Sequence, residues 1–311
     1  KAQGKIKGYS DSRGIVDSEG KKVANVTSTT KEMVSEDYFM THPAFLADAD
    51  LGGGFGNNNG TNDNGISGIW IGKYEASLAN KADGTNIVPS SSNANILLKN
   101  NTDKTIVTKP GYSSWRYIRI GNMYDNAKYY STDLESHMLK NSEWGAIAYL
   151  TESKYGRNGT EIGFSDDGYI TGGGENNAYA TTNQDQSTTG NVYGIYDMRG
   201  GAFENVASYY TGGNSSSLNN GSSFTNTKTS DKYATAYTGT SASTSYKYGD
   251  ATYETSGWHS DVAIFVNSPY PFFERGGHCR LDAPYAGVFC FNSSAGYADG
   301  GVSFRLALCV E

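Results

Sequence analysis

The sequence predicts a mixed α+β domain with many loops, and three observations support this fold class. Glycine (39 residues) and tyrosine (24 residues) are abundant, whereas charged residues make up only 18% of the 311 residues. Such a composition favours strands and loops over a helical bundle. The closing segment 302–310 has the alternation of a strand, and the segment 132–155 has the spacing of a helix. A chain of this length can form one large domain or two small ones.

The C-terminal strand is the clearest β signal. Apolar residues occupy every second position of this segment: Val302, Phe304, Leu306, Leu308 and Val310. This period predicts a half-buried strand with those side chains in the core. Ala286–Phe291 is a second β-prone run, and the polar, glycine-rich residues 292–301 between the two predict a loop.

The clearest helical signal lies between Thr132 and Tyr155. Thr132 and Glu135 fit a capping box, in which the two side chains satisfy free backbone donors at the start of a helix. A buried face is predicted at helical spacing by Trp144, Ile147, Ala148 and Thr151. Gly156 is placed for a C-cap, and a break at Asn141–Ser142 would divide the region into two helices.

Three other segments carry β and turn signals. Ile66–Ser77 predicts an early strand, and Glu75 in it lacks a partner carboxylate, so we expect a structural hydrogen bond there rather than general acid catalysis. Asn191–Tyr210 predicts a strand, a tight turn and a strand, with glycines that permit positive φ. In the Ser/Thr/Gly/Asn-rich segment 211–249, Lys232–Tyr237 and Ser243–Tyr248 predict a hairpin.

Residues 1–35 predict an N-terminal extension or small hairpin, ahead of a main domain at 36–311. The chain starts at Lys1, so a signal or anchor segment could precede it. The glycine-rich loop 51–65 lacks the Lys-Ser/Thr of a phosphate-binding loop. Asp48 and Asp50 could hold a structural calcium ion, although Gly52 stands where the EF-hand pattern places its next ligand. We therefore expect no cofactor, with that calcium site as the alternative.

Charge and composition exclude several kinds of partner. The net charge is −7 and no basic stripe is present, which argues against a nucleic-acid partner. No apolar run approaches the ~20 residues of a membrane span, so we expect no membrane insertion. The three cysteines, Cys279, Cys290 and Cys309, are an odd and clustered set, which does not predict a disulfide framework. The four histidines show no ligand spacing.

Four separated motifs, in the same order, resemble C-type lectin domains of the formylglycine-generating-enzyme type. The C-terminal one consists of Arg275-Gly276-Gly277, then AGVF at 286–289, and Ser303-Phe304-Arg305. The GKYE run at 72–75 and the SEWGAIAYL helix at 142–150 resemble earlier parts of the family. The remaining motif, the third along the chain, is matched at Asn191, Tyr193, Gly194, Tyr196, Asp197, Met198, Gly200 and Glu204. Phe203 and Asn205 replace its tryptophans, and Gly201 replaces its asparagine.

The C-terminal motif more narrowly resembles the variable region of target proteins of diversity-generating retroelements. In that family, adenines of Asn-type codons are randomised, which cannot yield Lys, Glu, Gln, Met or Trp. These five residue types occur 42 times in the chain, so about five would be expected among 36 residues. The segment 275–310 contains none of them. A glycine-rich β terminus that is poor in long side chains is the alternative explanation.

The resemblance implies a C-type lectin fold with large loop insertions and a ligand-binding role for the variable region at 275–310. The residues predicted to form the variable, ligand-binding surface are His278, Arg280, Leu281, Asp282, Pro284, Tyr285, Cys290, Asn292, Ser293, Ser294, Tyr297 and Asp299. Aromatic anchors among small polar groups are typical of such surfaces. The expected partner is a protein or glycan on a target cell, and the expected location is a phage tail or a bacterial exterior. The oligomeric state is left open.

Two alternatives to this non-catalytic function remain. The family's namesake oxidase holds copper with two cysteines after its RGG motif, but Leu281 and Ala286 stand at those places here. Cys279 and Cys290 lie at other positions, and no metal site or catalytic motif is predicted. The second alternative is an inert structural module of a tail or coat, in which the same loops bind nothing.

Overall fold

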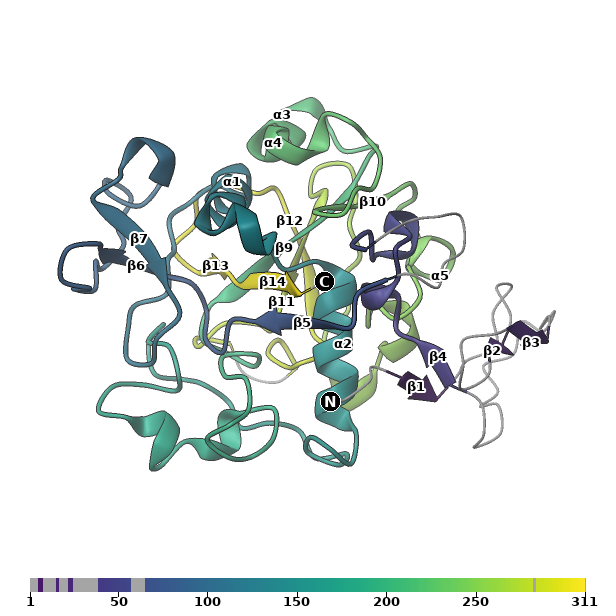
Figure 1. Cartoon of the computed structure of the whole chain (residues 1–311), viewed down its shortest axis with the longest axis horizontal. Helices are drawn as coiled ribbons and strands as arrows, with labels where there is room; N and C mark the ends of the chain where they lie inside the picture. The colour runs from purple at the N-terminus through teal and green to yellow at the C-terminus, as the bar shows by residue number, and fades with distance from the viewer. Residues whose placement is uncertain are drawn as a thin grey trace.

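A computed structural model of the chain describes residues 39–56, 65–281 and 284–310, together with three short strands before residue 39. It is mixed α/β, with several sheets and few helices, which is compatible with the predicted α+β class (Figure 1). The helices are α1 (Ile120–Tyr130), α2 (Asn141–Glu152), α3 (Ser215–Leu218), α4 (Ser222–Thr225) and α5 (Ala242–Ser245). No described helix combines the length and apolar character needed to cross a membrane.

The largest sheet is built around β9 (Phe203–Tyr210). On one edge β9 pairs antiparallel with β11 (Phe272–Arg275), which in turn pairs antiparallel with β12 (Phe291–Ser294). Its other edge pairs in parallel with β13 (Val302–Phe304) near its start and with β10 (Thr235–Tyr237) near its end. Seven of the eight residues of β9 are buried, as expected for a strand with partners on both edges.

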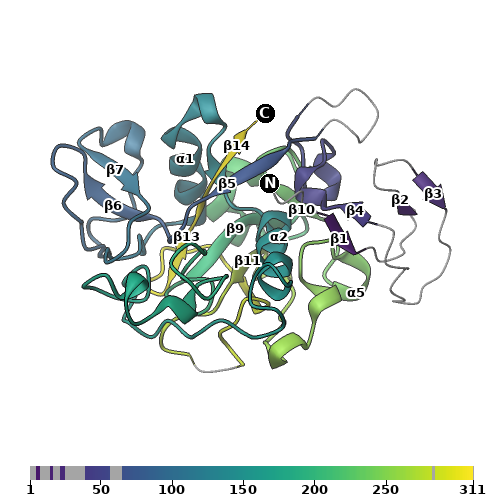
Figure 2. The ribbon, with the colours of Figure 1, turned by 60° about the horizontal axis from the view of Figure 1, so that its bottom comes forward.

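A second sheet places the C-terminal strand in its centre. β14 (Leu306–Val310) lies between β5 (Gly68–Ile71) and β8 (His137–Met138), antiparallel to both. The hairpin of β6 (Ser77–Asn80) and β7 (Lys104–Val107) stands to one side of both sheets (Figures 1 and 2). In the N-terminal part, β1 (Lys5–Lys7) pairs with β4 (Phe39–Thr41), and β2 (Ile15–Val16) pairs with β3 (Lys22–Ala24).

The predicted strand at 302–310 is present but divided at Arg305 between the two sheets. The expectation that Val302, Phe304 and Leu306 are buried is confirmed, whereas Leu308 is only half-buried. The prediction of a half-buried strand was wrong, because Ser303, Arg305, Ala307 and Cys309 on the other side are buried as well. Sheets with strands or helices on both faces bury both sides of a strand, and alternation in the sequence does not reveal this.

The predicted helix at 132–155 is correct only in its second half. Residues 132–134 form a 3-10 turn and Glu135 has positive φ, so the capping box at Thr132 and Glu135 was wrong. Instead, the Glu143 side chain accepts a hydrogen bond from the Lys140 amide at 2.8 Å and caps α2. The helix ends at Glu152, so Gly156 is not its C-cap. The predicted buried face is confirmed at Trp144, Ile147, Ala148 and Thr151.

Two other strand predictions were wrong in position. Ala286–Cys290 is mostly turn, and the strand begins only at Phe291, so three residues predicted as loop belong to β12. The predicted hairpin at 232–248 does not form. Thr235–Tyr237 pairs with β9 instead, and Ala242–Ser245 is a helical turn. Val288 and Phe289 have a high β propensity yet lie in a turn, and Thr235–Tyr237 pairs with a distant strand, so tertiary contacts decide the structure in both places.

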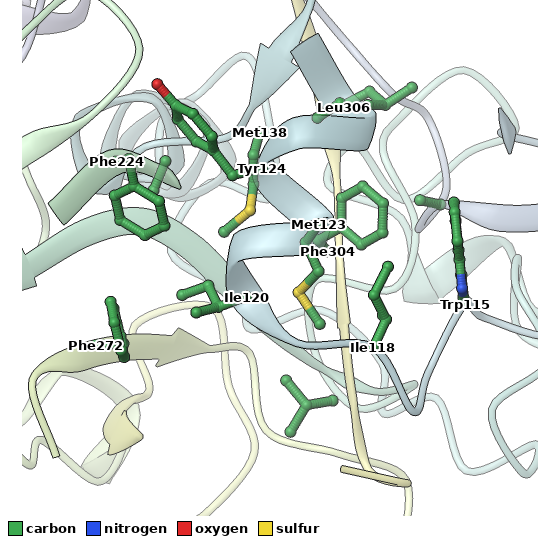
Figure 3. Packing of buried hydrophobic residues seen from close by; sticks show 14 of the residues in the cluster. Trp115, Ile118, Ile120, Met123, Tyr124, Met138, Phe224, Phe272, Phe304 and Leu306 are labelled. Carbon is green, nitrogen blue, oxygen red and sulfur yellow. The ribbon is translucent and has the colours of Figure 1, made fainter. Parts of the chain in front are cut away.

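The core packs α1 against the two sheets. Figure 3 shows Ile120, Met123 and Tyr124 of α1 among Phe304 and Leu306 of the C-terminal strands. Helix α1 was not predicted from the sequence, although its buried face is apolar. Trp144, predicted to lie in the core, is fully buried in a second cluster, and its indole N–H donates to the Val288 carbonyl at 2.8 Å.

Two arginines of the C-terminal motif are fully buried and join distant loops. Arg305 donates from Nε to Glu204 Oε2 on β9 at 3.0 Å, and its terminal nitrogens reach the carbonyls of Gly72 and Tyr196 at 2.8 Å. Arg275 donates to the carbonyls of Asp250 and Ala251, at 3.1 and 2.9 Å. Buried guanidinium groups require such partners, so these contacts fix the loops around both ends of segment 275–310.

We predict that Arg305→Ala lowers the free energy of unfolding by ~3–5 kcal/mol, because it leaves the Glu204 carboxylate buried without its cation. Urea denaturation measures the effect. Arg119→Ala, which removes an exposed arginine next to α1, serves as the control and should change stability by less than ~0.5 kcal/mol. A loss below ~1 kcal/mol for Arg305→Ala would contradict the structural role of this residue.

Candidate functional site

A cleft of about 350 Å³ opens beside the C-terminal segment and brings part of the predicted surface together. Three predicted residues line it: His278, Arg280 and Asp299. Three residues from distant parts of the chain complete its walls: Arg116, Tyr117 and Tyr169. Gly300 and Gly301 form its remaining lining. We refer to this site, lined by these eight residues, as the cleft.

The two tyrosines of the cleft have strained backbones. Tyr117 has φ 59° and Tyr169 has φ 67°, a region that bulky side chains rarely adopt. Hydrogen bonds hold both of them. The Tyr117 amide donates to the Asp299 carbonyl at 2.8 Å, and the amide and hydroxyl of Ser114 both donate to the Tyr169 carbonyl at 3.0 Å. Strain of this kind concentrates at functional sites, where the surroundings enforce the conformation.

Two guanidinium groups lie over Tyr169. The Arg116 Cζ lies 4.2 Å from the centre of the tyrosine ring, and the Arg280 Cζ lies 5.6 Å from it. Arg116 Nη1 also donates to the Gly300 carbonyl at 2.6 Å. Cation–π contacts of this kind orient arginine side chains without neutralising their charge. The cleft therefore presents positive charge in a chain whose net charge is −7.

His278 is half-buried and its ring orientation is fixed. It packs edge-on against Phe203 at 5.3 Å between ring centres, and its Nδ1 accepts a hydrogen bond from the Arg280 amide at 3.1 Å. Burial, and then the Arg280 charge, lower the pKa of His278 below its usual 6.5, which favours the neutral ring. Because Nδ1 is the acceptor, the neutral ring carries its proton on Nε2 and can donate it to a ligand.

The other predicted residues do not all face the cleft. Tyr285 and Tyr297 are 52% and 57% exposed but do not line it. Asn292, Ser293 and Ser294 are half-buried on β12. Successive residues of a strand point to opposite faces, so Ser293 points away from the side shared by its two neighbours. The surface predicted from the sequence is therefore only partly one patch.

One of the predicted surface residues requires correction, two are half-buried, and one cannot be placed. Cys290 is 1% exposed, so its inclusion on a binding surface was wrong. Leu281 is half-buried and packs against the main hydrophobic core. Pro284 is half-buried, and its carbonyl accepts from the Val262 amide at 2.9 Å. Asp282 lies outside the described residues. Cys290 and Leu281 thus contribute to the support of these loops.

The three cysteines occupy three separate surroundings. Cys279 packs with Tyr169 and Ala202, whereas Cys309 packs with Phe55 and Ile66. The Cys290 thiol contacts the Tyr285 carbonyl at 3.5 Å. Burial raises the pKa of all three thiols, that of Cys290 to about 12. The thiolate form needed for metal ligation or nucleophilic attack is therefore disfavoured.

The candidate calcium ligands act as local structure. The Asp48 carboxylate accepts a hydrogen bond from the Asp50 amide at 2.8 Å and caps the 3-10 turn Ala49–Leu51. Within the described ranges, no group of three His, Cys, Asp or Glu side chains is placed to hold a metal ion. Residues 57–64 of the neighbouring glycine-rich loop lie outside the description.

Glu75 has the structural hydrogen bond expected from the sequence. Its Oε1 accepts from the Ala202 amide at 2.8 Å, deep in the molecule. Burial, and then the charges of Asp197 and Glu204, hold its pKa well above the usual range, which favours the protonated form. Two of the motif glycines behave as predicted, because Gly200 and Gly201 have positive φ, and a Cβ on Gly201 would lie 2.6 Å from Glu75 Oε1. The first of the two strands predicted in 191–210 was wrong, because residues 191–202 form turns and only Phe203–Tyr210 is a strand.

A second, larger hollow of about 540 Å³ lies among the turns at 167–183. Its lining includes Asp167, Glu175 and Asn183 together with small residues. The Asn183 amide group donates to the Asp167 carboxylate, so these two polar groups of the lining already bond to each other. Tyr169 of the cleft and Ile170 of this hollow are neighbours in the chain. We regard the cleft as the stronger candidate, because two arginines, a histidine and an aspartate converge there.

The sequence matches no model of a protein family and no curated protein.

No direct signal in the sequence predicted the three cleft residues that lie outside the C-terminal segment. Arg116 and Tyr117 stand in an aromatic-rich run, and Tyr169 stands in a turn-rich stretch without a recognisable motif. They reach the C-terminal loops only because residues 113–117 pair with 169–171 and with Asp299 through backbone hydrogen bonds. The one available signal was the arginine flanked by aromatics at 115–117, which is too common to identify a site.

Glu274 on β11 yields a pH prediction. It is 8% exposed, and burial, with a smaller contribution from Asp299, raises its pKa from 4.5 to about 7. The folded protein therefore binds a proton more tightly than the unfolded chain, and stability falls as the pH rises from about 4.5 through 7. This pKa shift corresponds to ~3 kcal/mol. Deprotonation of Glu274 should therefore lower the free energy of unfolding by up to that amount between pH 5 and pH 8, and Glu274→Gln should abolish this part of the decrease.

Urea denaturation at both pH values measures this difference. Asp133→Asn, which changes an exposed carboxylate, is the control and should retain the pH dependence of the unmodified chain. If Glu274→Gln showed the same pH dependence as the unmodified chain, Glu274 would be ionised throughout, and the raised pKa would be wrong.

Proposed function

We propose that this protein is a non-catalytic ligand-binding protein whose C-terminal loops are diversified by a retroelement. In this proposal the domain has a C-type lectin fold of the formylglycine-generating-enzyme type, and a phage tail or a bacterial exterior displays it. Its partner would be a protein or glycan on a target cell. The observation that carries the proposal is that His278, Arg280 and Asp299, all from the candidate variable segment, meet in one cleft.

Contacts between the four family-like motifs support the lectin-type frame. Arg305 of the last motif binds Glu204 and the Tyr196 carbonyl of the third, and it also reaches the Gly72 carbonyl of the first. The second motif contributes Trp144, over which the Arg275 guanidinium lies at 5.5 Å. Motifs that are far apart in the sequence thus contact one another through their matching residues, as a shared frame requires.

The division between buried and exposed residues supports a diversified surface. A site that accepts many side chains needs a backbone held by residues outside that site. Arg275 and Phe304 are fully buried, whereas Arg280, Tyr285, Tyr297 and Asp299 are exposed. Substitution at exposed positions usually changes stability by less than ~0.5 kcal/mol, so these loops can vary while the frame persists.

The oxidase alternative receives no support from the thiols. Copper-binding cysteines must converge as thiolates, but here the three thiols lie in separate surroundings with raised pKa values. The inert structural module differs from the proposal in one respect, because it requires no variation in the loops.

The proposal predicts a specific arrangement of the neighbouring DNA. Sequencing downstream of the coding region should find a near-identical repeat of the part that encodes residues 275–310, together with a reverse transcriptase gene. Differences between the two copies should be confined to adenines of the repeat and should affect codons such as those for His278, Arg280, Tyr297 and Asp299. Codons for Arg275 and Arg305 should be identical and serve as the internal control. Absence of the repeat, or differences spread over all bases, would contradict the proposal.

A further inference from the structure

The cleft contains cationic groups that lack carboxylate partners. Among the described residues, neither Arg116 nor Arg280 forms an ion pair with an acidic side chain. Arg116 Nη1 is occupied by the Gly300 carbonyl, but its Nε is buried and has no hydrogen-bond partner. A guanidinium group without a carboxylate partner attracts an anionic ligand, so Arg116 and Arg280 favour an acceptor group in the cleft.

The remaining groups of the cleft offer one further donor and one acceptor. The neutral His278 ring carries its proton on Nε2, and a Cβ on Gly301 would lie 3.7 Å from His278 Cδ2, so this edge of the ring faces the cleft lining. Asp299 Oδ1 accepts from the Gly301 amide at 2.7 Å, whereas no hydrogen bond from the described residues reaches its Oδ2, which can accept from a ligand. A ligand that matches all these groups carries an anion and, beside it, a hydroxyl or similar donor.

We propose that the cleft binds one acidic sugar residue, with its carboxylate at Arg116 and Arg280 and a hydroxyl at Asp299. This inference rests on the proposed function, because it names the ligand class for the same cleft. Guanidinium forks match the planar geometry of a carboxylate. A simple inorganic anion fits less well, since it has no donor for Asp299 and would be repelled by it. The volume of about 350 Å³ lies near the lower end for small-ligand sites, which limits the ligand to a single ring.

The test is a titration of the full chain with glucuronate, glucose and sulfate, followed by chemical-shift changes at low salt. We expect saturable binding of glucuronate, no binding of glucose, and at least about tenfold weaker binding of sulfate. Arg280→Gln should weaken glucuronate binding by about tenfold, the effect of one lost charge-assisted hydrogen bond. Gly301→Ala should also weaken it, because the added methyl would lie 3.3 Å from Asp299 Oδ1 and would displace the carboxylate that accepts the ligand hydroxyl. Arg119→Gln, with the same charge change outside the cleft lining, should leave it unchanged.

Three outcomes would overturn the inference. They are the absence of saturable glucuronate binding, sulfate binding as tight as glucuronate binding, and equal weakening by Arg119→Gln and Arg280→Gln. The second would mean a site for simple anions, and the third would mean attraction by overall charge. The DNA repeat separates this inference from the proposed function. If the repeat is present and glucuronate fails to bind, only the ligand class is wrong, whereas absence of the repeat contradicts the function whatever the titration shows.

Discussion

The buried ion pair between Arg305 and Glu204 is the interaction on which the rest of the structure depends. It lies where the C-terminal strand leaves one sheet for the other, so β13 pairs with β9 before it and β14 pairs with β5 and β8 after it. Replacing a buried ion pair by apolar groups is often neutral, but removing one partner is costly. The same guanidinium also satisfies the carbonyls of Gly72 and Tyr196, so one side chain fixes the positions of three separate segments.

This arrangement allows rigid support and a variable surface to coexist in a single short segment. Arg275 and Arg305 point inward from the two ends of the segment, while His278, Arg280 and Asp299 from the loops between them meet at the cleft. The cleft walls also depend on Arg116, Tyr117 and Tyr169, which lie outside the segment. In the proposed function these outside residues stay constant, and they would give every variant of the loops the same cationic and aromatic background.

Local sequence patterns predicted the parts of the fold that local physics determines. The apolar face of α2, the core position of Trp144 and the positive φ of Gly200 and Gly201 follow from spacing and residue type. The sequence could not predict that Thr235–Tyr237 joins β9, or that β14 is buried on both sides, because these depend on partners far away in the chain. For the same reason, the sequence identified only the cleft residues within the C-terminal segment. It also placed Cys290 on the binding surface, whereas this residue is buried in the structure.

The most direct test of the central claim, a tolerant surface on a rigid frame, is to compare two libraries. One library randomises codons 278, 280, 297 and 299, and the other randomises codons 204, 275, 304 and 305. Resistance of each library to proteolysis in increasing urea measures the fraction of folded members. We expect most members of the first library to unfold at the same urea concentration as the unmodified chain. Most members of the second library should be unfolded without urea, since core changes cost ~2–5 kcal/mol. Equal loss of folded members in both libraries would contradict the account.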